Sequence, residues 1–164
     1  MTPLNWAYSS TTSPEPLAGP QMHDSPSGTR PHAPIDVQWI GGLTFEAGQA
    51  ERPKVRIDAD GQTAPSPFDV LLAGIATCAS VDVVTILEKQ RTPVQALNVR
   101  VESSRVDSIP RRLASAILHF SIKAPGTTIE KATRAVELSV TKYCSVRSSL
   151  IADAPVTWTV ELKT

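Results

Sequence analysis

Apolar and polar residues alternate in several short stretches of the chain, and this period of two predicts β-strands with one face against a core. The stretches span residues 35–39, 43–45, 54–58, 97–102, 114–122 and 156–163. Gly41 and Gly42 indicate a tight turn between the first two strands. Because most of the strands have one polar face, the pattern favours a six-stranded sheet of mainly antiparallel strands with one face exposed to solvent.

A long apolar segment between the third and fourth strands predicts a helix. Ser66 is expected as its N-cap, Pro67 as its first residue and Asp69 as the acidic partner in a capping box, and the helix extends to about Gln90. Apolar side chains lie on nearly every face of this helix, so it must be surrounded. One sheet and one further helix are too little to surround it, and we therefore predict an intimate homodimer.

A second helix is predicted from Thr127 to about Tyr143, and it opens with another capping box. Its apolar stripe consists of Ala132, Ala135, Val136, Val140 and Tyr143. The element order is therefore β-β-β-α-β-β-α-β, which is an α+β fold.

Residues 1–34 differ in composition from the rest of the chain, because they contain seven of its fourteen prolines and few charges. We interpret them as an extended arm outside a domain that spans residues 35–164. The N-terminus has neither the basic nor the apolar region of a secretory signal, so the cytoplasm is the expected location.

Charge and composition exclude several classes of function. Sixteen basic residues balance sixteen acidic ones, and this lack of excess positive charge argues against binding to nucleic acid or to an anionic membrane surface. The apolar run from Phe68 to Leu87 is interrupted by Asp69 and Asp82, which disfavours a membrane span. The two cysteines and three scattered histidines lack the spacing of a metal site.

The reactive candidates are the two thiols, Cys78 in the first helix and Cys144 at the end of the second. Each is interpreted either as a small buried apolar residue or as one half of a redox pair. Because Cys78 lies about three turns inside its helix, the helix dipole does not reach it, and a nearby cation is expected to stabilise its thiolate. The candidate cations are Arg52, Arg56, Arg105 and Arg147.

The sequence around both cysteines resembles the OsmC/Ohr family. The matching residues are 64–72, Cys78, 81–87, 138–139 and 142–146, and Trp39 with residues 42–45 resembles the first hairpin of the OsmC-like branch. The resemblance covers residues 35–164. It implies a dimer in which two long central helices are wrapped by the sheets of both subunits.

The resemblance also implies a function, namely reduction of organic hydroperoxides in defence against oxidative stress, without a metal or organic cofactor. Cys78 takes the peroxidatic position, Cys144 the resolving position, and an external dithiol reduces the disulfide. Two positions depart from the active peroxidases, since Phe68 stands where they have Glu and Leu43 where they have Arg. The alternative function is therefore a non-enzymatic dimer that binds a small apolar ligand or senses oxidants.

Three further polar residues have structural interpretations. Asp82 shares a helical face with Cys78 and is expected to accept hydrogen bonds or to pair with an arginine at the dimer interface. Arg105, with Glu102 three residues before it, is expected to form an ion pair at the interface or on the sheet surface, and His119 to be a half-exposed residue of the sheet.

Overall fold

The computed structural model describes residues 28, 30–150 and 152–163. The chain divides between Pro34 and Ile35 into two units, and the account below concerns the second unit, residues 35–164. The prediction of an extended arm over residues 1–34 falls almost entirely outside the described residues.

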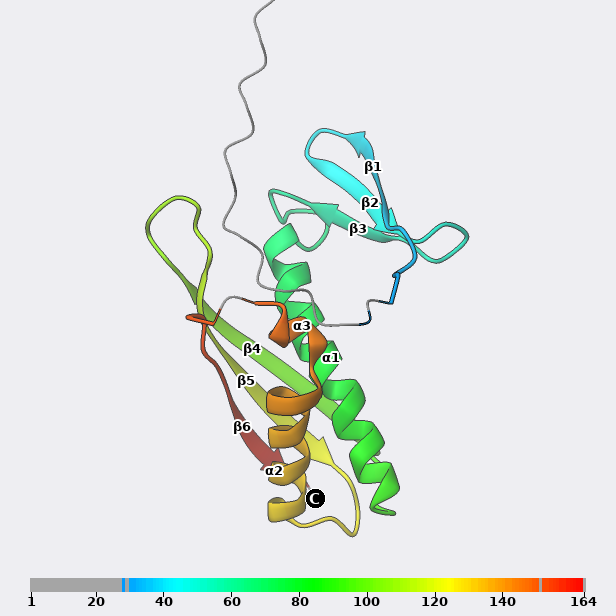
Figure 1. Ribbon diagram of the computed structural model, residues 1–164, viewed down its shortest axis with the longest axis vertical. Helices are drawn as coiled ribbons and strands as arrows, with labels where there is room; N and C mark the ends of the chain where they lie inside the picture. The colour runs from blue at the N-terminus through cyan, green and yellow to red at the C-terminus, as the bar shows by residue number, and fades with distance from the viewer. Residues whose placement is uncertain (1–27, 29, 151, 164) are drawn as a thin grey trace, which may run out of the picture. The chain divides into compact units, whose positions relative to one another are not determined.

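The elements of the second unit follow the predicted order (Figure 1). They are β1 (Asp36–Gly41), β2 (Thr44–Gly48), β3 (Val55–Asp58), α1 (Pro67–Lys89), β4 (Ala96–Arg105), β5 (Leu113–Lys123), α2 (Ile129–Leu138), α3 (Ser145–Ser148) and β6 (Val156–Leu162). A π-helical turn, Ser139–Tyr143, joins α2 to α3. The predicted α+β class is confirmed.

The strands form two sheets of three, so the prediction of one six-stranded sheet is wrong for the single chain. In the first sheet, β2 pairs with β1 and β3, and both pairings are antiparallel. In the second sheet β5 lies between β4 and β6, and its pairing with β6 is parallel. The parallel pair arises because α2 crosses over between β5 and β6 and returns the chain to the end of the sheet where β5 began.

Helix α1 begins with the predicted capping box. Ser66 Oγ accepts a hydrogen bond from the Asp69 backbone N–H at 3.2 Å, and Asp69 Oδ2 accepts one from the Ser66 backbone N–H at 2.9 Å. Pro67 occupies the first helical position.

Helix α1 is long and apolar enough, by length and composition only, to cross a bilayer, because an 18-residue window of it has a mean hydropathy of 2.2. Within one copy of the chain, 28% of that window is buried.

The substitution Ser66→Ala is expected to lower the free energy of unfolding by about 1 kcal/mol, because it leaves the Asp69 backbone N–H without its hydrogen-bond partner. Chemical denaturation of both proteins at neutral pH measures this difference. Hydrogen bonds from the Ser66 side chain and backbone lower the pKa of Asp69. The part of the stability that depends on the Asp69 carboxylate is therefore present above the unfolded-state pKa and lost as the pH falls through the folded-state pKa. The difference in the free energy of unfolding between the wild-type protein and Ser66→Ala should therefore shrink in acid.

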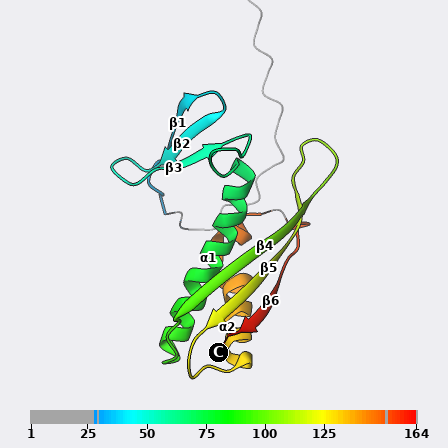
Figure 2. The same ribbon diagram turned by 180° about the vertical axis from the view of Figure 1, so that it is seen from behind.

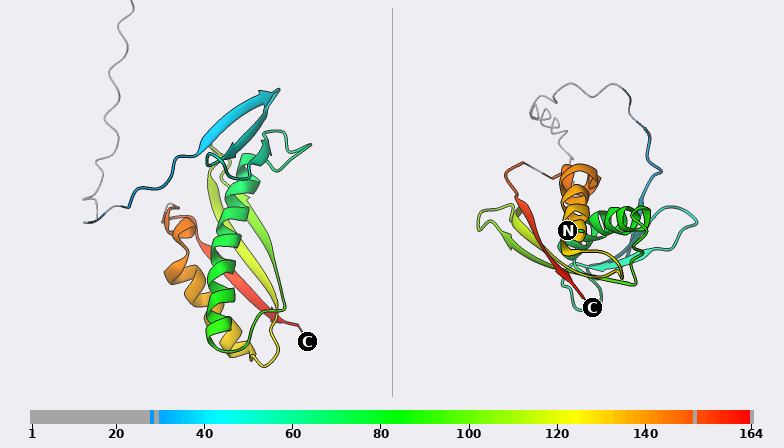
Figure 3. Two further views of the ribbon diagram at one scale, coloured as in Figure 1. Left: turned by 90° about the vertical axis from the view of Figure 1, so that its right-hand side faces the viewer. Right: turned by 90° about the horizontal axis from the view of Figure 1, so that it is seen from below.

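The core lies between the second sheet and the helices. Both α1 and α2 cover the same face of this sheet (Figure 3), and α1 contributes Ile75, Ala79, Val83 and Leu87 to the contact, all of them buried. Phe120 is the largest fully buried side chain and pairs in register with Val99 of β4 and Val160 of β6. These contacts fix the position of the middle of α1.

The opposite face of the sheet, which is turned toward the viewer in Figure 2, carries Arg100, Glu102 and His119. His119 is half-buried there, as predicted, and its Nδ1 lies 2.9 Å from Thr159 Oγ1. Glu102 pairs with Arg100 at 3.2 Å and lies 3.6 Å from His119 Nε2. In the described residues Glu102 therefore does not pair with Arg105, whose Nε–H donates to the Arg111 carbonyl oxygen at 2.7 Å. An ion pair of Arg105 at a dimer interface stays a prediction.

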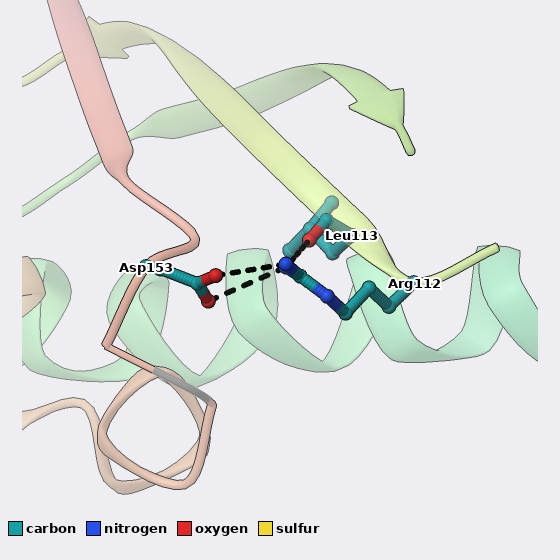
Figure 4. A network of polar contacts seen from close by, with 3 residues as sticks. All are labelled: Arg112, Leu113 and Asp153. Carbon is teal, nitrogen blue, oxygen red and sulfur yellow. Dashed lines mark hydrogen bonds and ion pairs between the residues drawn. The ribbon is translucent and has the colours of Figure 1, made fainter. Parts of the chain in front are cut away.

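An ion pair holds the segment after α3 against the start of β5 (Figure 4). Arg112 Nη2 donates to Asp153 Oδ2 at 2.8 Å, and Arg112 Nη1 donates to Asp153 Oδ1 at 3.3 Å. Both side chains are largely exposed, so the pair contributes little to stability, of the order of 0.2–1 kcal/mol. Its geometric effect is to hold in place the segment that links α3 to β6.

Candidate functional site

The fold brings Cys78 and Cys144 together from different helices. Cys78 lies near the middle of α1, half-buried, and Cys144 is buried at the junction between the π-helical turn and α3. Each thiol influences the pKa of the other, and the Cys144 thiol donates to the Ile75 carbonyl oxygen at 3.8 Å. Both thiols are free, so the structure shows the reduced form of the pair. The proximity of the two residues fits the predicted redox pair, and their catalytic roles stay a prediction.

The π-helical turn determines which side chain at the end of α2 faces the core. The Cys144 N–H donates to the Ser139 carbonyl oxygen at 2.8 Å, a bond that spans five residues. Each residue in such a wider turn rotates less than in an α-helix, and π-helical turns are common at functional sites. Cys144 therefore continues the buried stripe, whereas Tyr143, which was predicted to belong to it, is 48% exposed.

The start of α3 surrounds both sulfur atoms with hydrogen-bond donors. Cys144 occupies the N-cap position, and its Sγ accepts a hydrogen bond from the Arg147 N–H at 3.3 Å. The Oγ atom of Ser145 lies 3.8 Å from Cys78 Sγ. The backbone N–H groups of Ser145 and Val146 also act on the Cys78 sulfur. These donors come from one short segment of the chain, residues 144–147.

The pKa of the Cys78 thiol is lowered. Burial is the largest single influence and raises this pKa, because it disfavours the charged thiolate. Hydrogen bonds from the Val146 N–H, the Cys144 thiol and Ser145 act in the opposite direction and together outweigh it. Cys78 is therefore the thiol of this pair that ionises more readily, and the thiolate is the nucleophilic form of cysteine.

The pKa of the Cys144 thiol is raised, mainly by burial. The Arg147 N–H lowers it, but the hydrogen bond to Cys78 and the negative charge of the Cys78 thiolate raise it further. Cys144 therefore keeps its proton while Cys78 is ionised. The pair combines a nucleophilic thiolate with an adjacent protonated thiol, which is the arrangement that oxidation to a disulfide requires.

Within one copy of the chain, no arginine is among the main influences on the pKa of Cys78, so the activating cation stays a prediction. Arg56 pairs with Glu46 at 3.0 Å, and the Arg105 guanidinium lies 4.3 Å from the centre of the Phe68 ring. Arg147 acts through its backbone N–H, and it acts on Cys144. Backbone N–H groups and a neighbouring thiol favour the Cys78 thiolate, which is the role expected of a guanidinium. Sequence inspection misses such donors, because every non-proline residue carries the same backbone N–H.

We expect the rate at which iodoacetamide alkylates Cys78 to rise with pH, with a midpoint below the value of about 8.5 for free cysteine. The substitution Cys144→Ala removes a donor that favours the thiolate, so it should raise this midpoint. Cys144→Ser keeps a hydroxyl donor and should raise it less. Rates measured from pH 6 to pH 10, with modification located by mass spectrometry, test the order, and equal midpoints in all three proteins would contradict it.

Other polar groups do not extend the site within one copy of the chain. In the described residues, no three side chains of His, Cys, Asp or Glu are grouped closely enough to hold a metal ion. Asp82 is half-buried on the Cys78 face of α1, and the described residues give its carboxylate no hydrogen-bond or ion-pair partner. A groove of about 570 Å³ between α1 and β4 is lined by residues such as Ala76 and Val99, and Cys78 is not among its lining residues.

Comparison with known proteins identifies the family. A family model described as OsmC-like protein matches residues 59–160. Protein YhfA of Escherichia coli K12 is 35% identical over 127 residues, which cover 77% of this chain and 95% of YhfA.

Two solved structures share the fold. The crystal structure of an OsmC-like protein from Mycoplasma pneumoniae has a TM-score of 0.71 at 16% identity, and the match covers 83% of this chain and all of that one. The organic hydroperoxide resistance protein OhrB of Bacillus subtilis has a TM-score of 0.55 at 16% identity, with 79% and 98% covered. The length and identity of the sequence matches show that this chain belongs to the OsmC-like protein family.

Proposed function

We propose that this protein reduces organic hydroperoxides, with Cys78 as the attacking thiolate and Cys144 as the resolving thiol. One observation carries the proposal: hydrogen bonds lower the pKa of Cys78 beside a second free thiol that keeps its proton. Membership of the OsmC-like family and the likeness of the fold to a hydroperoxide resistance protein support it.

The reaction proceeds in three steps. The Cys78 thiolate attacks the terminal oxygen of R–O–O–H, the O–O bond breaks, and the products are a Cys78 sulfenic acid and an alkoxide that takes a proton to become the alcohol. Cys144 then loses its proton, its sulfur attacks the Cys78 sulfur, and hydroxide leaves as water when it takes that proton. An external dithiol reduces the resulting disulfide by thiol–disulfide exchange.

The test is to mix the reduced protein with an alkyl hydroperoxide and follow peroxide, free thiols and intact mass. The proposal expects one peroxide consumed for each Cys78–Cys144 pair, loss of both thiols, and a mass lower by two hydrogen atoms. The alternative function has two forms. A dimer that binds a small apolar ligand expects binding with the peroxide and both thiols unchanged, and a dimer that senses oxidants expects loss of both thiols without sustained turnover in excess dithiol.

We further propose that two copies form a homodimer through the apolar surface that one copy leaves exposed. Val37 and Trp39 on β1 and Val81 on α1 are each 65% exposed, and Leu43 at the β1–β2 turn is 53% exposed. Burying these side chains against a second copy removes apolar area from water and covers the long apolar helix. In the described part of the chain, the outer strands of both three-stranded sheets also have unpaired edges that a second copy could pair with.

Sedimentation equilibrium at micromolar concentration tests the dimer, and Val81→Asp should shift the equilibrium to the monomer. A monomeric wild-type protein at these concentrations contradicts the proposal. We place the dimer in the cytoplasm, where thiols are kept reduced, and fractionation of cells that express the protein tests this location.

A further inference from the structure

A cavity of about 340 Å³ lies between α3 and the start of β6, and we call it the α3–β6 cavity. Its volume is at the lower end of the range for pockets that bind small molecules, so it has room for a small ligand. Four of its lining residues are apolar and two can donate hydrogen bonds. The lining residues are Arg147, Ser148, Leu150, Ala152, Ala154 and Pro155.

Arg147 gives this cavity a positive charge that no acidic residue of the described chain neutralises. Arg147 is half-buried, and its guanidinium has no hydrogen-bond or ion-pair partner among the described residues. Asp153 is the only acidic residue between positions 145 and 155, and Arg112 donates to both of its carboxylate oxygens, at 2.8 and 3.3 Å (Figure 4). Because a partly buried cation without a counterion is costly, the cavity favours an anion.

An arginine beside another hollow of the surface shows the contrast. Arg134 lines a groove of about 410 Å³ on α2, where it donates to Glu137 at 2.7 Å, and Glu130 lines the same groove. That groove therefore carries excess negative charge, and its arginine is already paired. Within the described part of the chain, Arg147 is the one of these two arginines that can take an anion from solution.

The rest of the α3–β6 cavity indicates the chemical class of the anion. A guanidinium binds a carboxylate or a phosphate through two parallel N–H···O hydrogen bonds. One guanidinium matches the single charge of a carboxylate, whereas a phosphate dianion would keep a charge without a counterion. The side chains of Leu150 and Pro155 favour a ligand that also has an apolar part.

We propose that the α3–β6 cavity binds a small organic carboxylate, with the carboxylate on the Arg147 guanidinium and the apolar part against Leu150 and Pro155. The backbone N–H of Arg147 donates to Cys144 Sγ at 3.3 Å, so one residue contacts both the ligand and the buried thiol. Binding needs no redox chemistry, and the inference therefore goes beyond the proposed function and does not depend on it.

The test follows the backbone amide signals of the full-length reduced protein by two-dimensional NMR during titration with hexanoate. We expect saturable shifts concentrated at the lining residues, and much smaller shifts with hexanamide, which has the same apolar chain without the charge. Arg147→Met should weaken hexanoate binding by about tenfold or more, because it removes charge-assisted hydrogen bonds. Arg147→Lys keeps the charge but loses the paired hydrogen bonds, so its affinity should be intermediate.

Arg134→Met is the matched control, because it removes an arginine that lines a groove of similar size but is paired with Glu137, and it should leave hexanoate binding unchanged. Thermal unfolding shows whether each variant is folded. The inference is overturned if the lining residues show no saturable shift, if hexanamide binds as tightly as hexanoate, or if phosphate binds more tightly. Wild-type affinity in folded Arg147→Met also overturns it. A protein that binds hexanoate here but consumes no hydroperoxide contradicts the proposed function and supports this inference.

Discussion

Replacing Cys78 by serine is expected to reduce the rate of hydroperoxide consumption by more than about a thousandfold, to that of the uncatalysed reaction. A serine hydroxyl stays protonated at neutral pH, so the hydrogen bonds that favour a Cys78 thiolate have no anion to stabilise. The measurement is peroxide consumption in the presence of excess dithiol, at equal concentrations of folded wild-type and variant protein.

Cys144→Ser is the matched control for this experiment. It leaves the attacking thiolate in place, so in the absence of added dithiol the variant should consume one equivalent of peroxide and stop at a Cys78 sulfenic acid that a 1,3-dione reagent traps. Continued turnover by Cys78→Ser would contradict the assignment of the attacking residue. Full turnover by Cys144→Ser with every reductant tested would contradict the resolving role.

The secondary structure could be read from the sequence because its signals are local. The capping box at Ser66 and Asp69 involves residues three positions apart, and the structure confirms it along with the order of strands and helices. The partners of the sheets are not local. Whether β3 pairs with a strand of the second sheet depends on where α1 places the strands that follow it. The alternation of apolar and polar residues within one strand does not show which strands lie beside it.

The site was predictable in its residue types and not in its electrostatics. The two cysteines are rare residues in recognisable segments, so their identity is evident from the sequence. The lowered pKa of Cys78 depends on backbone N–H groups at residues 145 and 146, which the π-helical turn brings beside the sulfur. If residues 139–143 are taken to form a regular α-helix, Tyr143 is predicted to lie on the buried stripe. That assumption misses both the π-helical turn and the backbone N–H donors.

The substitution Phe120→Ala is expected to lower the free energy of unfolding by about 3–5 kcal/mol, because it leaves a cavity in a core that cannot close fully around it. The Phe120 side chain is 1% exposed in the middle of the central strand β5, on the face that α1 and α2 cover. A loss of this size is a large share of the roughly 5–15 kcal/mol that stabilises a typical domain. Urea denaturation at one fixed protein concentration measures it.

Ile117→Ala is the control, since Ile117 lies three residues earlier on β5 with its side chain on the opposite face and 37% exposed. It should cost well under half as much, and equal losses would show that the core is not where the structure places it. The comparison also separates two ways of losing activity. Phe120→Ala should reduce peroxide consumption in proportion to the fraction of protein that is unfolded, whereas Cys78→Ser should abolish it in protein that is fully folded, because the first residue supports the position of α1 and the second supplies the reacting atom.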